Sequence, residues 1–221
     1  MDEVVPGVSI YSEFPRRYLN AYVVDDVLVD SGVRWWTDRF LRELEGHDVR
    51  AHALTHAHPD HQGKTARVCE ALDVPLWCHE AERDAAERGA TLDPMPDTLP
   101  SRLLDRFAGG PGHPVARTLS EGDSVGSFQV VETPGNAPGH VSLWRERDGT
   151  LLLGDVLASL DTRTFRRGLT TLPASFTADP AEAVRSARTV ADLEPETVCF
   201  GHGPPLHDGT RFQEFVATLE E

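Results

Sequence analysis

The sequence predicts an α+β fold in which two similar halves pack their sheets inside and their helices outside. The first observation is the order of the expected elements, which runs strands, helix, strand, helix and then repeats. The second is the spacing of the apolar residues, which changes between the period of strands and the period of helices. The third is the length of 221 residues, which suits one ordinary globular domain and is too short for two large ones. We therefore expect a single domain over residues 1–221.

The first half opens with three β-rich runs, at residues 8–14, 18–24 and 27–30. The turn Asp25-Asp26 joins the last two, as in an antiparallel meander. A helix follows, because four apolar residues at helical spacing can share one face: Val33, Trp36, Phe40 and Leu44. At this spacing at least one of Trp35 and Trp36 is expected in the core, and the other could line a pocket.

A strand at residues 49–55 and a helix from residue 62 flank a histidine-rich loop. The helix is indicated by Thr65, Val68, Cys69 and Leu72, which recur at i, i+3, i+4 and i+7. A short strand at 75–78 and a polar helix at 80–88 come next. Proline and glycine then become frequent over residues 91–114, which we interpret as a surface insertion.

The second half begins with four expected strands, at residues 115–119, 124–133, 141–147 and 150–154. Asp148-Gly149 supplies a hairpin turn between the last two. Asp179 is a good N-cap before Pro180, so a helix is expected from there to about residue 193. A buried strand at 197–200 and an amphipathic helix over 212–219 complete the chain.

Composition excludes some classes of partner. The chain has 36 acidic and 21 basic residues and a formal charge of −15, which would repel a nucleic-acid backbone. The acidic start carries no signal-peptide pattern, and no run of 18 uncharged apolar residues follows, so we expect a cytoplasmic protein without a membrane partner. Cys69, Cys78 and Cys199 form no C-x-x-C pair and are expected to be small buried hydrophobic residues.

The motif with the strongest chemical signal is His56-Ala57-His58-Pro59-Asp60-His61, directly after the expected strand 49–55. A tight loop of this kind can direct four side chains at one small volume. Imidazole and carboxylate suit Zn²⁺ and similar divalent metals. The chance of this pattern arising by accident is roughly one in several hundred, so we interpret it as a metal site rather than a structural cluster.

Three more potential ligands lie at the ends of expected strands: His140, Asp155 and His202. Alone, either histidine could equally be structural. Loops at strand ends are where a rigid scaffold places its functional residues, and these loops could meet the first motif at one edge. The residues therefore predict a centre with seven nitrogen and oxygen ligands.

Four motifs together resemble the metallo-β-lactamase superfamily: T-H-x-H-x-D-H, T-P-G-x-x-P-G-H, L-L-x-G-D and G-H-G. The resemblance covers nearly the whole chain and implies an αββα sandwich with the metal centre at one edge. It implies His56, His58 and His140 on one metal ion, Asp60, His61 and His202 on the other, and Asp155 between them. Asn136 departs from the common T-P-G-H-T-P-G-H form, which should alter the surroundings of the site more than the site itself.

The expected cofactor is a pair of divalent metal ions, with Zn²⁺ first and Fe or Mn as alternatives. Such a pair can lower the pKa of a shared water to about 7 and polarise a carbonyl. Asp60 is the candidate catalytic residue, as a ligand first and as a group that orients the hydroxide second. We expect a hydrolase that acts on a small ester-like substrate, most plausibly a thioester, as in the glyoxalase-II-like branch.

Three alternatives stay open at this point. Only 19 residues follow His202, so the helical glutathione-binding domain of true glyoxalase II enzymes is not expected, and lactonase or β-lactamase activity remains a rival. A persulfide-dioxygenase-like enzyme would need one iron on two histidines and a carboxylate, for which His56, His140 and Asp155 would suffice. The third is a non-enzymatic binding module on the same fold, which the complete ligand set argues against.

A few residues outside the motifs are candidates for substrate binding. Arg166 and Arg167, with Arg163 beside them, could clamp an anionic substrate, because guanidinium matches carboxylate geometry, although a solvated face explains them equally well. His207 lies five residues after His202 and could support the site or the substrate. His79 opens the polar helix and is expected to be a capping residue.

Overall fold

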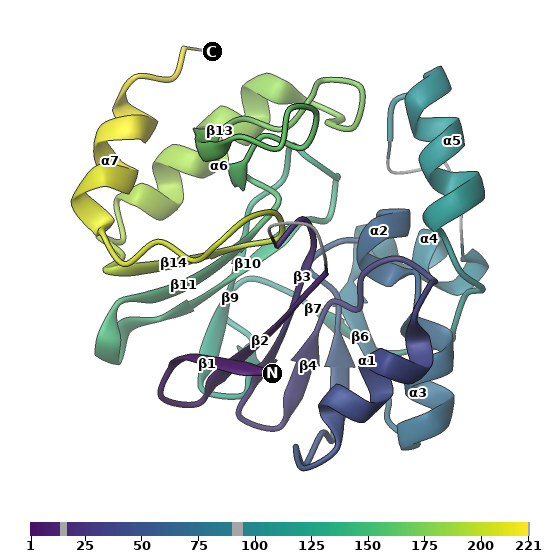
Figure 1. Cartoon of the computed structure of the whole chain (residues 1–221). Coiled ribbons are helices and arrows are strands. Elements are labelled where there is room, and N and C mark those ends of the chain that lie inside the picture. Colours follow the sequence, from purple (N-terminus) through teal and green to yellow (C-terminus); the bar gives the residue numbers. More distant parts are fainter. Residues whose placement is uncertain (14–16, 90–94, 221) are drawn as a thin grey trace.

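The computed structural model describes residues 1–13, 17–89 and 95–220 and arranges them as two sheets, face to face, with helices on both outer faces (Figure 1). These are the layers of the αββα sandwich that the sequence predicts. The end of the expected strand 8–14 and the start of the insertion 91–114 fall outside the described residues.

The first sheet has seven strands in sequence order. Its first four strands are paired antiparallel, and the pairs from β4 to β7 are parallel. The strands are β1 (Asp2–Val5), β2 (Val8–Ser12), β3 (Asn20–Val24), β4 (Val27–Val29), β5 (Ala51–Ala53), β6 (Leu76–His79) and β7 (Val115–Leu119).

The second sheet has five strands in the order β14-β11-β10-β9-β8. Only the β11–β14 pair in it is parallel. Its strands are β8 (Ser124–Val125), β9 (Phe128–Glu132), β10 (Val141–Arg145), β11 (Thr150–Gly154) and β14 (Thr197–Phe200). A small two-stranded sheet, β12 (Ala158–Leu160) with β13 (Arg167–Thr170), lies beside it at the same end as α2 (Figure 1).

Helices cover both sheets, and their bounds are α1 (Thr37–Leu44), α2 (Pro59–Gln62), α3 (Thr65–Leu72), α4 (Arg83–Arg88), α5 (Leu99–Ala108), α6 (Pro180–Ala191) and α7 (Gly209–Ala217), with 3₁₀ turns η1 (Glu80–Glu82) and η2 (Glu146–Asp148). Helices α1, α3 and α4 pack on the first sheet, and α6 and α7 on the second. In Figure 1, α5 stands at the outer edge, above α4.

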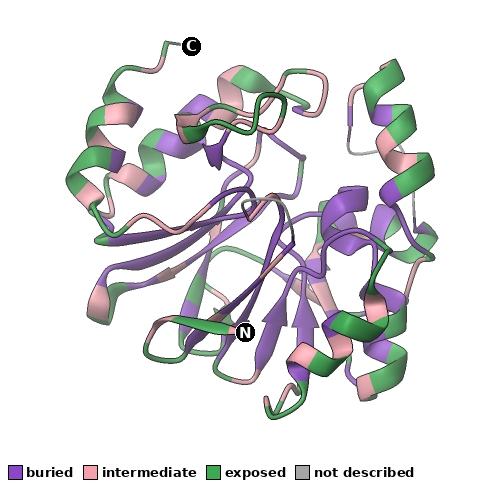
Figure 2. Cartoon of the chain, in the orientation of Figure 1, coloured by how far each residue is buried: buried purple, intermediate pink, exposed green. Residues whose placement is uncertain are grey.

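Alternation of side chains along the strands produces this layering. In β11, Leu152 faces the core between the sheets, whereas Leu151 and Leu153 face α6 and α7. In the first sheet, Val29 faces the inner core and Leu28 faces α1 and α3. Both faces of each central strand are thus covered, which is why Figure 2 shows these central strands almost wholly buried, whereas the edge strand β1 is exposed or half-buried.

Most expected elements are confirmed, with shifts at their ends. Two expectations were wrong: the strand at 124–133 is the hairpin of β8 and β9, and the strand at 115–119, expected in the second half, is the last strand of the first sheet. The bounds of the strands at 115–119, 150–154 and 197–200 agree with the structure, and Asp179 accepts a hydrogen bond from the backbone N–H of Glu182 as the N-cap of α6. His79 caps η1 as expected, because its Nδ1 accepts from Ala81 N at 3.1 Å.

The expectation for the tryptophans was wrong, since Trp35 is 45% exposed and Trp36 is 60% exposed. Helix α1 begins only at Thr37, after Trp36 in a left-handed conformation (φ 58°). Helical spacing therefore does not extend back to Trp36, although Phe40 and Leu44 are buried as predicted.

The three cysteines are free and buried, as expected. Burial raises the pKa of the Cys69, Cys78 and Cys199 thiols to about 12, which keeps them protonated and unreactive. Among the residues that the structure describes, no helix combines the length and the apolar character needed to cross a membrane.

Candidate metal centre

All seven predicted ligands lie together at one edge of the sandwich, and each is at most 8% exposed. Each comes from the segment that follows a strand or from the loop just before one. They are His56 and His58 after β5, Asp60 and His61 on α2, His140 before β10, Asp155 after β11 and His202 after β14.

The first motif is a loop only in part, because its second half forms the short helix α2. Pro59 occupies the first turn, where its missing N–H costs nothing. The turn brings His61 back against His56, so that the centroids of the two rings are 4.2 Å apart. The rings of His56 and His58 are 4.4 Å apart, and those of His56 and His140 are 5.0 Å apart.

Two subsets bring their donor atoms within 4.8 Å of one another. One is His56, His61 and Asp155, and the other is Asp60, His61 and His202. Asp155 lies at the middle, with its Oδ2 3.3 Å from His61 Nε2 and 3.1 Å from His202 Nε2. That Asp155 bridges two ions, and how the histidines divide between those ions, both stay predictions.

Hydrogen bonds to the second ring nitrogen orient three of the histidines. His56 Nδ1 lies 2.9 Å from Thr55 Oγ1, His61 Nδ1 lies 2.9 Å from Asp30 Oδ2, and His202 Nδ1 donates to the Tyr18 carbonyl at 2.6 Å. In each case Nε2 is left to face the centre. Such outer contacts set the tautomer and the ring orientation of metal-binding histidines.

The donor set fits a metal, as two buried atoms show. His56 Nε2 and Asp155 Oδ1 are both buried without a hydrogen-bond partner. An unsatisfied buried polar atom costs about 1–3 kcal/mol, so native structures rarely keep one without a reason. A divalent cation at this point would satisfy both atoms.

His140 has a different arrangement. Its Nδ1 lies 2.9 Å from Thr133 Oγ1, and its Nε2 accepts a hydrogen bond from the backbone N–H of Asp155 at 2.9 Å. Both ring nitrogens therefore have protein partners in this structure. Metal binding through His140 Nε2 would require that hydrogen bond to be exchanged for the metal.

Electrostatics favour an ionised Asp155 with neutral His56 and His140 beside it, whereas the pKa values of His61 and His202 are raised. Burial, reinforced by the neighbouring histidines, holds the pKa of His56 well below its ordinary value, and burial lowers the pKa of His140 to about 4. Burial alone would raise the pKa of Asp155, but His202 and His61 outweigh it and hold the pKa well below the ordinary value. Burial would likewise lower the pKa of His61, but Asp155 and Asp30 raise it.

Asp30 supports the site and was not singled out from the sequence. It is 2% exposed, and its carboxylate accepts from both the backbone N–H and the hydroxyl of Thr55, each at 2.8 Å. Through Thr55 it acts on His56, and it contacts His61 directly. Its position at the end of a buried strand, like that of Asp155, is the signal that could have found it.

Glu82 is a second residue that sequence reasoning missed. This carboxylate is fully buried and accepts from Ala57 N at 2.9 Å and from Gly139 N at 2.8 Å. Burial raises its pKa, while the two backbone hydrogen bonds oppose that rise. The polar composition of the expected helix 80–88 hid it, because nothing in the sequence marks this one glutamate as buried.

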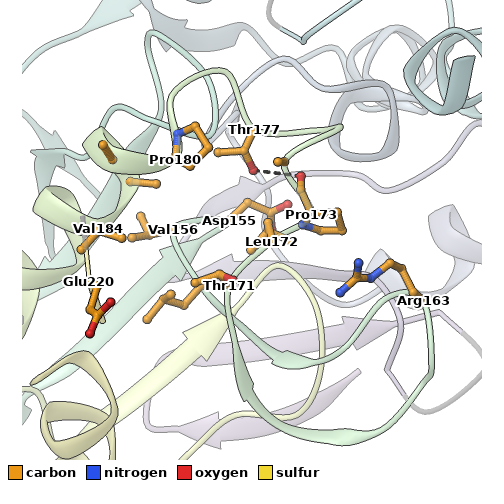
Figure 3. A pocket seen from close by; sticks show the side chains of 14 residues that line it. Asp155, Val156, Arg163, Thr171, Leu172, Pro173, Thr177, Pro180, Val184 and Glu220 are labelled. Atoms are coloured by element: carbon orange, nitrogen blue, oxygen red, sulfur yellow. Dashed lines mark hydrogen bonds between the residues drawn. The ribbon is translucent and has the colours of Figure 1, made fainter. Parts of the chain in front are cut away.

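Two neighbouring cavities lie beside the centre. A small one of about 40 Å³ is lined by Asp60, Asp155 and His202, with Leu172 and Pro173 on its outer side. A larger one of about 380 Å³ shares Asp155, Leu172 and Pro173 with it. Figure 3 shows the larger cavity, with Asp155 in its middle and Arg163 on the side away from Val184 and Glu220.

The predicted substrate-binding residues lie farther out. Arg166 and Arg167 are exposed, and Arg167 lines a separate cavity with Arg211, whereas Arg163 lines the cavity beside Asp155. His207 is exposed and contacts Thr197 Oγ1 at 3.2 Å, at the opposite end of β14 from His202. The chain folds back after His202. His207 is therefore close to His202 in the sequence but lies away from the metal centre.

Comparison with known proteins places this geometry in a family. The family model described as the metallo-beta-lactamase superfamily matches residues 15–202. A probable metallo-hydrolase of Bacillus subtilis, YflN, is 30% identical over 216 residues, which cover 87% of this chain and 80% of that protein.

Two further likenesses bear on metals and substrates. A solved structure of TTHA1623 in a di-iron-bound form has a TM-score of 0.66 and 30% identity, and the match covers 94% of this chain and 96% of that one. A hydroxyacylglutathione hydrolase of Bdellovibrio bacteriovorus is 30% identical over 138 residues, which cover 61% of this chain and 44% of that protein. With a family match over most of its length and the ligands gathered at one edge, this chain belongs to the metallo-β-lactamase superfamily.

Proposed function

We propose that this metallo-hydrolase holds two divalent metal ions in one centre and hydrolyses a small ester-like substrate, with a thioester as the first candidate. The observation that carries the proposal is the cluster of seven buried donors around Asp155, in which His56 Nε2 and Asp155 Oδ1 have no protein partner. The similarity to a protein solved in a di-iron-bound form supports a pair of ions. Zn²⁺, Fe and Mn are all compatible with imidazole and carboxylate ligands.

The residues present define what the chain itself contributes. His56, His58 and His140 would hold one ion, Asp60, His61 and His202 the other, and Asp155 both. Bound ions supply Lewis acidity, which lowers the pKa of water and polarises a carbonyl. Asp30 and Thr55 keep His56 and His61 oriented, and the half-buried Leu172 and Pro173 restrict the approach of bulk water.

A thioester is favoured over other ester-like bonds by one relative, the hydroxyacylglutathione hydrolase. The proposed role of Asp60 is to bind the second ion and, through its free oxygen, to orient the nucleophilic water. Asp60 Oδ2 lies 3.7 Å from His202 Nε2 and lines the small cavity at the centre. An anionic group on the substrate would meet Arg163, which lines the larger cavity, sooner than Arg166 or Arg167.

A second candidate function follows from one of the donor subsets. His56, His61 and Asp155 form a group of two histidines and one carboxylate, which is the ligand set of mononuclear non-haem iron oxygenases. This differs from the set His56, His140 and Asp155 suggested by the sequence. On this alternative one Fe(II) would suffice, and the enzyme would consume oxygen with a persulfide substrate.

One panel of assays separates these functions. Metal-free protein is reloaded with Zn²⁺, Mn²⁺ or Fe²⁺ and tested on an acyl thioester, an aliphatic lactone, a β-lactam and a persulfide with oxygen uptake recorded. The proposal expects thioester hydrolysis that returns with metal and needs no oxygen. Oxygen uptake with iron alone and no hydrolysis would replace it with the oxygenase, and a preference for the lactone or β-lactam would replace the thioester.

A further inference from the structure

The larger cavity has walls from three segments that meet beside Asp155. Its floor is Val156 and Leu157, which directly follow Asp155, and one wall is the first turn of α6 with Ala181 and Val184. Leu172 and Pro173 cover it from the side of the small central cavity. The cavity is open because the lining residues Ala181 and Ala183 of α6 have small side chains, and larger ones would fill it.

The walls of this cavity expose polar and apolar atoms about equally, and the apolar part is concentrated in a few buried side chains. Nine of the fourteen lining residues are apolar, and Val156, Leu157 and Val184 are at most 7% exposed. The hydroxyl of Thr177 already donates to the Pro173 carbonyl at 3.2 Å. Arg163 and Glu220 lie on opposite sides of the cavity with Asp155 between them (Figure 3), so its apolar part is the floor of Val156 and Leu157 and the wall at Val184.

The cover over the cavity is fixed to the metal-binding loop. The side-chain amide of Asn136 donates to the Phe176 carbonyl at 3.4 Å, and the backbone carbonyl of Asn136 accepts from Ala178 N at 3.1 Å. Asn136 lies four residues before His140 in the T-P-G-N-A-P-G-H segment. The residue that departs from the common motif therefore anchors the segment next to Leu172 and Pro173.

We propose that this cavity receives an uncharged aliphatic chain of the substrate, in the first place its acyl chain. This rests on the proposed function, because the chain must extend from a carbonyl at the metal centre. The acyl chain is bonded directly to that carbonyl carbon, and the apolar floor begins at Val156, one residue after the ligand Asp155. A chain on the alcohol or thiol side is the other source, and the test separates the two.

The test compares two series of substrates. One is S-acyl-N-acetylcysteamine with acetyl, butanoyl and hexanoyl groups, and the other is acetate esters of ethanol, butanol and hexanol. Full burial of a methylene is worth about fourfold in binding, so kcat/KM should rise on the order of a hundredfold from acetyl to hexanoyl. A rise in the alcohol series alone would overturn the acyl assignment, and no rise in either would overturn the cavity as a chain site.

A cavity-filling variant with a matched control tests the location. Ala181 is half-buried on the first turn of α6, whereas Thr189 is exposed on the same helix and outside the cavity lining. Ala181→Phe should reduce kcat/KM for the hexanoyl substrate at least tenfold and leave the acetyl substrate near the parent value. Thr189→Phe should change neither, and equal losses on both substrates in Ala181→Phe would contradict the proposal.

The outcomes also separate this proposal from the proposed function. Metal-dependent hydrolysis of the acetyl substrate without any gain with chain length would leave the proposed function standing and remove the cavity proposal. If the parent hydrolyses none of these compounds, calorimetric binding of hexanoate against acetate decides the cavity question without turnover. Tighter binding of hexanoate that Ala181→Phe abolishes would support the cavity, and equal binding would overturn it.

A second inference concerns Glu82, and a different observation carries it. Ala57 lies between His56 and His58, and Gly139 directly precedes His140. Each oxygen of the buried Glu82 carboxylate accepts a backbone N–H from one of these two loops. One side chain on a third segment thus holds together the backbones of all three histidines that the resemblance assigns to one ion.

The backbone of the loop before His140 packs closely against Glu82. A Cβ atom added to Gly139 would lie 2.6 Å from His79 Nδ1 and 2.9 Å from Glu82 Cγ. The loop that precedes His140 can therefore approach Glu82 only because residue 139 is glycine. Gln62 Nε2 donates to the Ala57 carbonyl at 2.9 Å and holds the first loop from its other side.

We infer that Glu82 is a positioning residue for the His56, His58 and His140 site. In Glu82→Gln the amide nitrogen cannot accept a hydrogen bond, so one loop loses its acceptor while the volume is kept. Loss of a supporting contact commonly weakens a metal site 10- to 100-fold, and we expect a fall of about that size in the affinity for one of two ions. The other ion should bind within a few-fold of the parent.

Glu87 provides the control, since its carboxylate on α4 also accepts a backbone N–H, from Val115 at 3.1 Å, away from the centre. Stepwise dissociation constants are measured by chelator competition with Zn²⁺, and the Co²⁺ absorption spectrum reports ligand geometry. Glu82→Gln should weaken one step and change the spectrum, and Glu87→Gln should do neither. Unchanged constants in Glu82→Gln, or equal changes in both variants, would refute the role, whatever happens to the melting temperature.

Discussion

Asp60 lies on α2, apart from the strand ends that carry Asp155 and most of the histidines. It is the more accessible of the two carboxylates, at 8% exposed against 4% for Asp155. Its partners in the second donor subset are His61 and His202. A one-metal site built on His56, His61 and Asp155 would not need it, so Asp60 separates the two candidate functions.

Asp60→Asn should empty one metal position while the fold survives. The amide is a weaker ligand of the same size, so we expect metal content to fall toward one per chain and kcat to fall on the order of a hundredfold. Metal content, hydrolysis rate and melting temperature are measured together on the variant and the parent. Full activity with one ion lost would show that the second ion is not catalytic.

His52 makes a pH-dependent contribution to stability outside the metal centre. Burial lowers its pKa from 6.5 to about 4. Its Nδ1 lies 3.2 Å from the Leu28 carbonyl and its Nε2 lies 2.9 Å from Thr65 Oγ1, with the side chain fully buried. Between pH 6.5 and 4 the unfolded chain therefore binds a proton that the folded chain does not, so stability is present above this window and is lost as the pH falls through it.

From these values, lowering the pH from 7 to 5 should reduce the free energy of unfolding by about 2 kcal/mol on account of His52. The free energy of unfolding of the metal-free parent and of His52→Gln is measured by urea denaturation at both pH values. The other histidines contribute equally in the two proteins, so the difference between the two losses reports His52 alone. An equal loss in the two proteins would show that His52 does not cause the acid sensitivity.

Single residues were predictable where their chemistry is rare and their spacing tight. The histidine-rich motif predicted four donors, and positions next to strand ends predicted His140, Asp155 and His202. The structure buries all seven together, and their binding of metal stays a prediction. Asp30 and Glu82 were not found, because a carboxylate is usually exposed and only the tertiary structure shows that these two are buried. His207 was expected near the centre because it is close to His202 in the sequence, but it lies at the other end of β14.

Among the elements, those with strong local signals were predicted well. The N-cap Asp179 with Pro180 marked the start of α6, and the apolar run before Asp155 marked β11. Helix α5 was missed because a proline- and glycine-rich segment reads as a loop, although Thr98 and Ser101 form a capping box there. Strands β12 and β13 are short and pair only with each other, so their sequence carried no clear period.

The capping of α6 can be tested directly. Asp179 accepts from the backbone N–H of Glu182 at 3.0 Å, and loss of such a cap costs about 1 kcal/mol. Asp179→Ala should lower the free energy of unfolding by that amount in urea denaturation. Asp179→Asn keeps an acceptor and should retain most of the stability, and a loss of equal size in both variants would contradict capping as the cause.

At the scale of the whole molecule, the order of elements predicted sheets inside and helices outside, and the resemblance of the motifs implied the αββα sandwich. The inner core is shared by both sheets, and each outer face is closed by its own helices. The positions of the loops at one edge follow from this layering, because His56, Asp155 and His202 all come after strands that end there. The parallel pairs β4–β5 and β11–β14 place those ends side by side.

The size and shape of the substrate site could not be predicted from the sequence. The larger cavity depends on the distance between α6 and the segment 171–177, which is set by packing across the second sheet. The sequence alone does not show that the two alanines of α6 face a cavity. The same limit explains why the sequence could not show that Arg163, rather than its neighbours Arg166 and Arg167, lines the cavity beside Asp155.

The central claim is a centre for two metal ions, and metal stoichiometry tests it most directly. Protein stripped by a chelator is titrated with Zn²⁺ and, under anaerobic conditions, with Fe²⁺, and bound metal per chain is measured after removal of excess ion. We predict saturation close to two ions per chain, with thioester hydrolysis reaching its maximum only as the second ion binds. Saturation at one ion, with full activity at that point, would contradict the account.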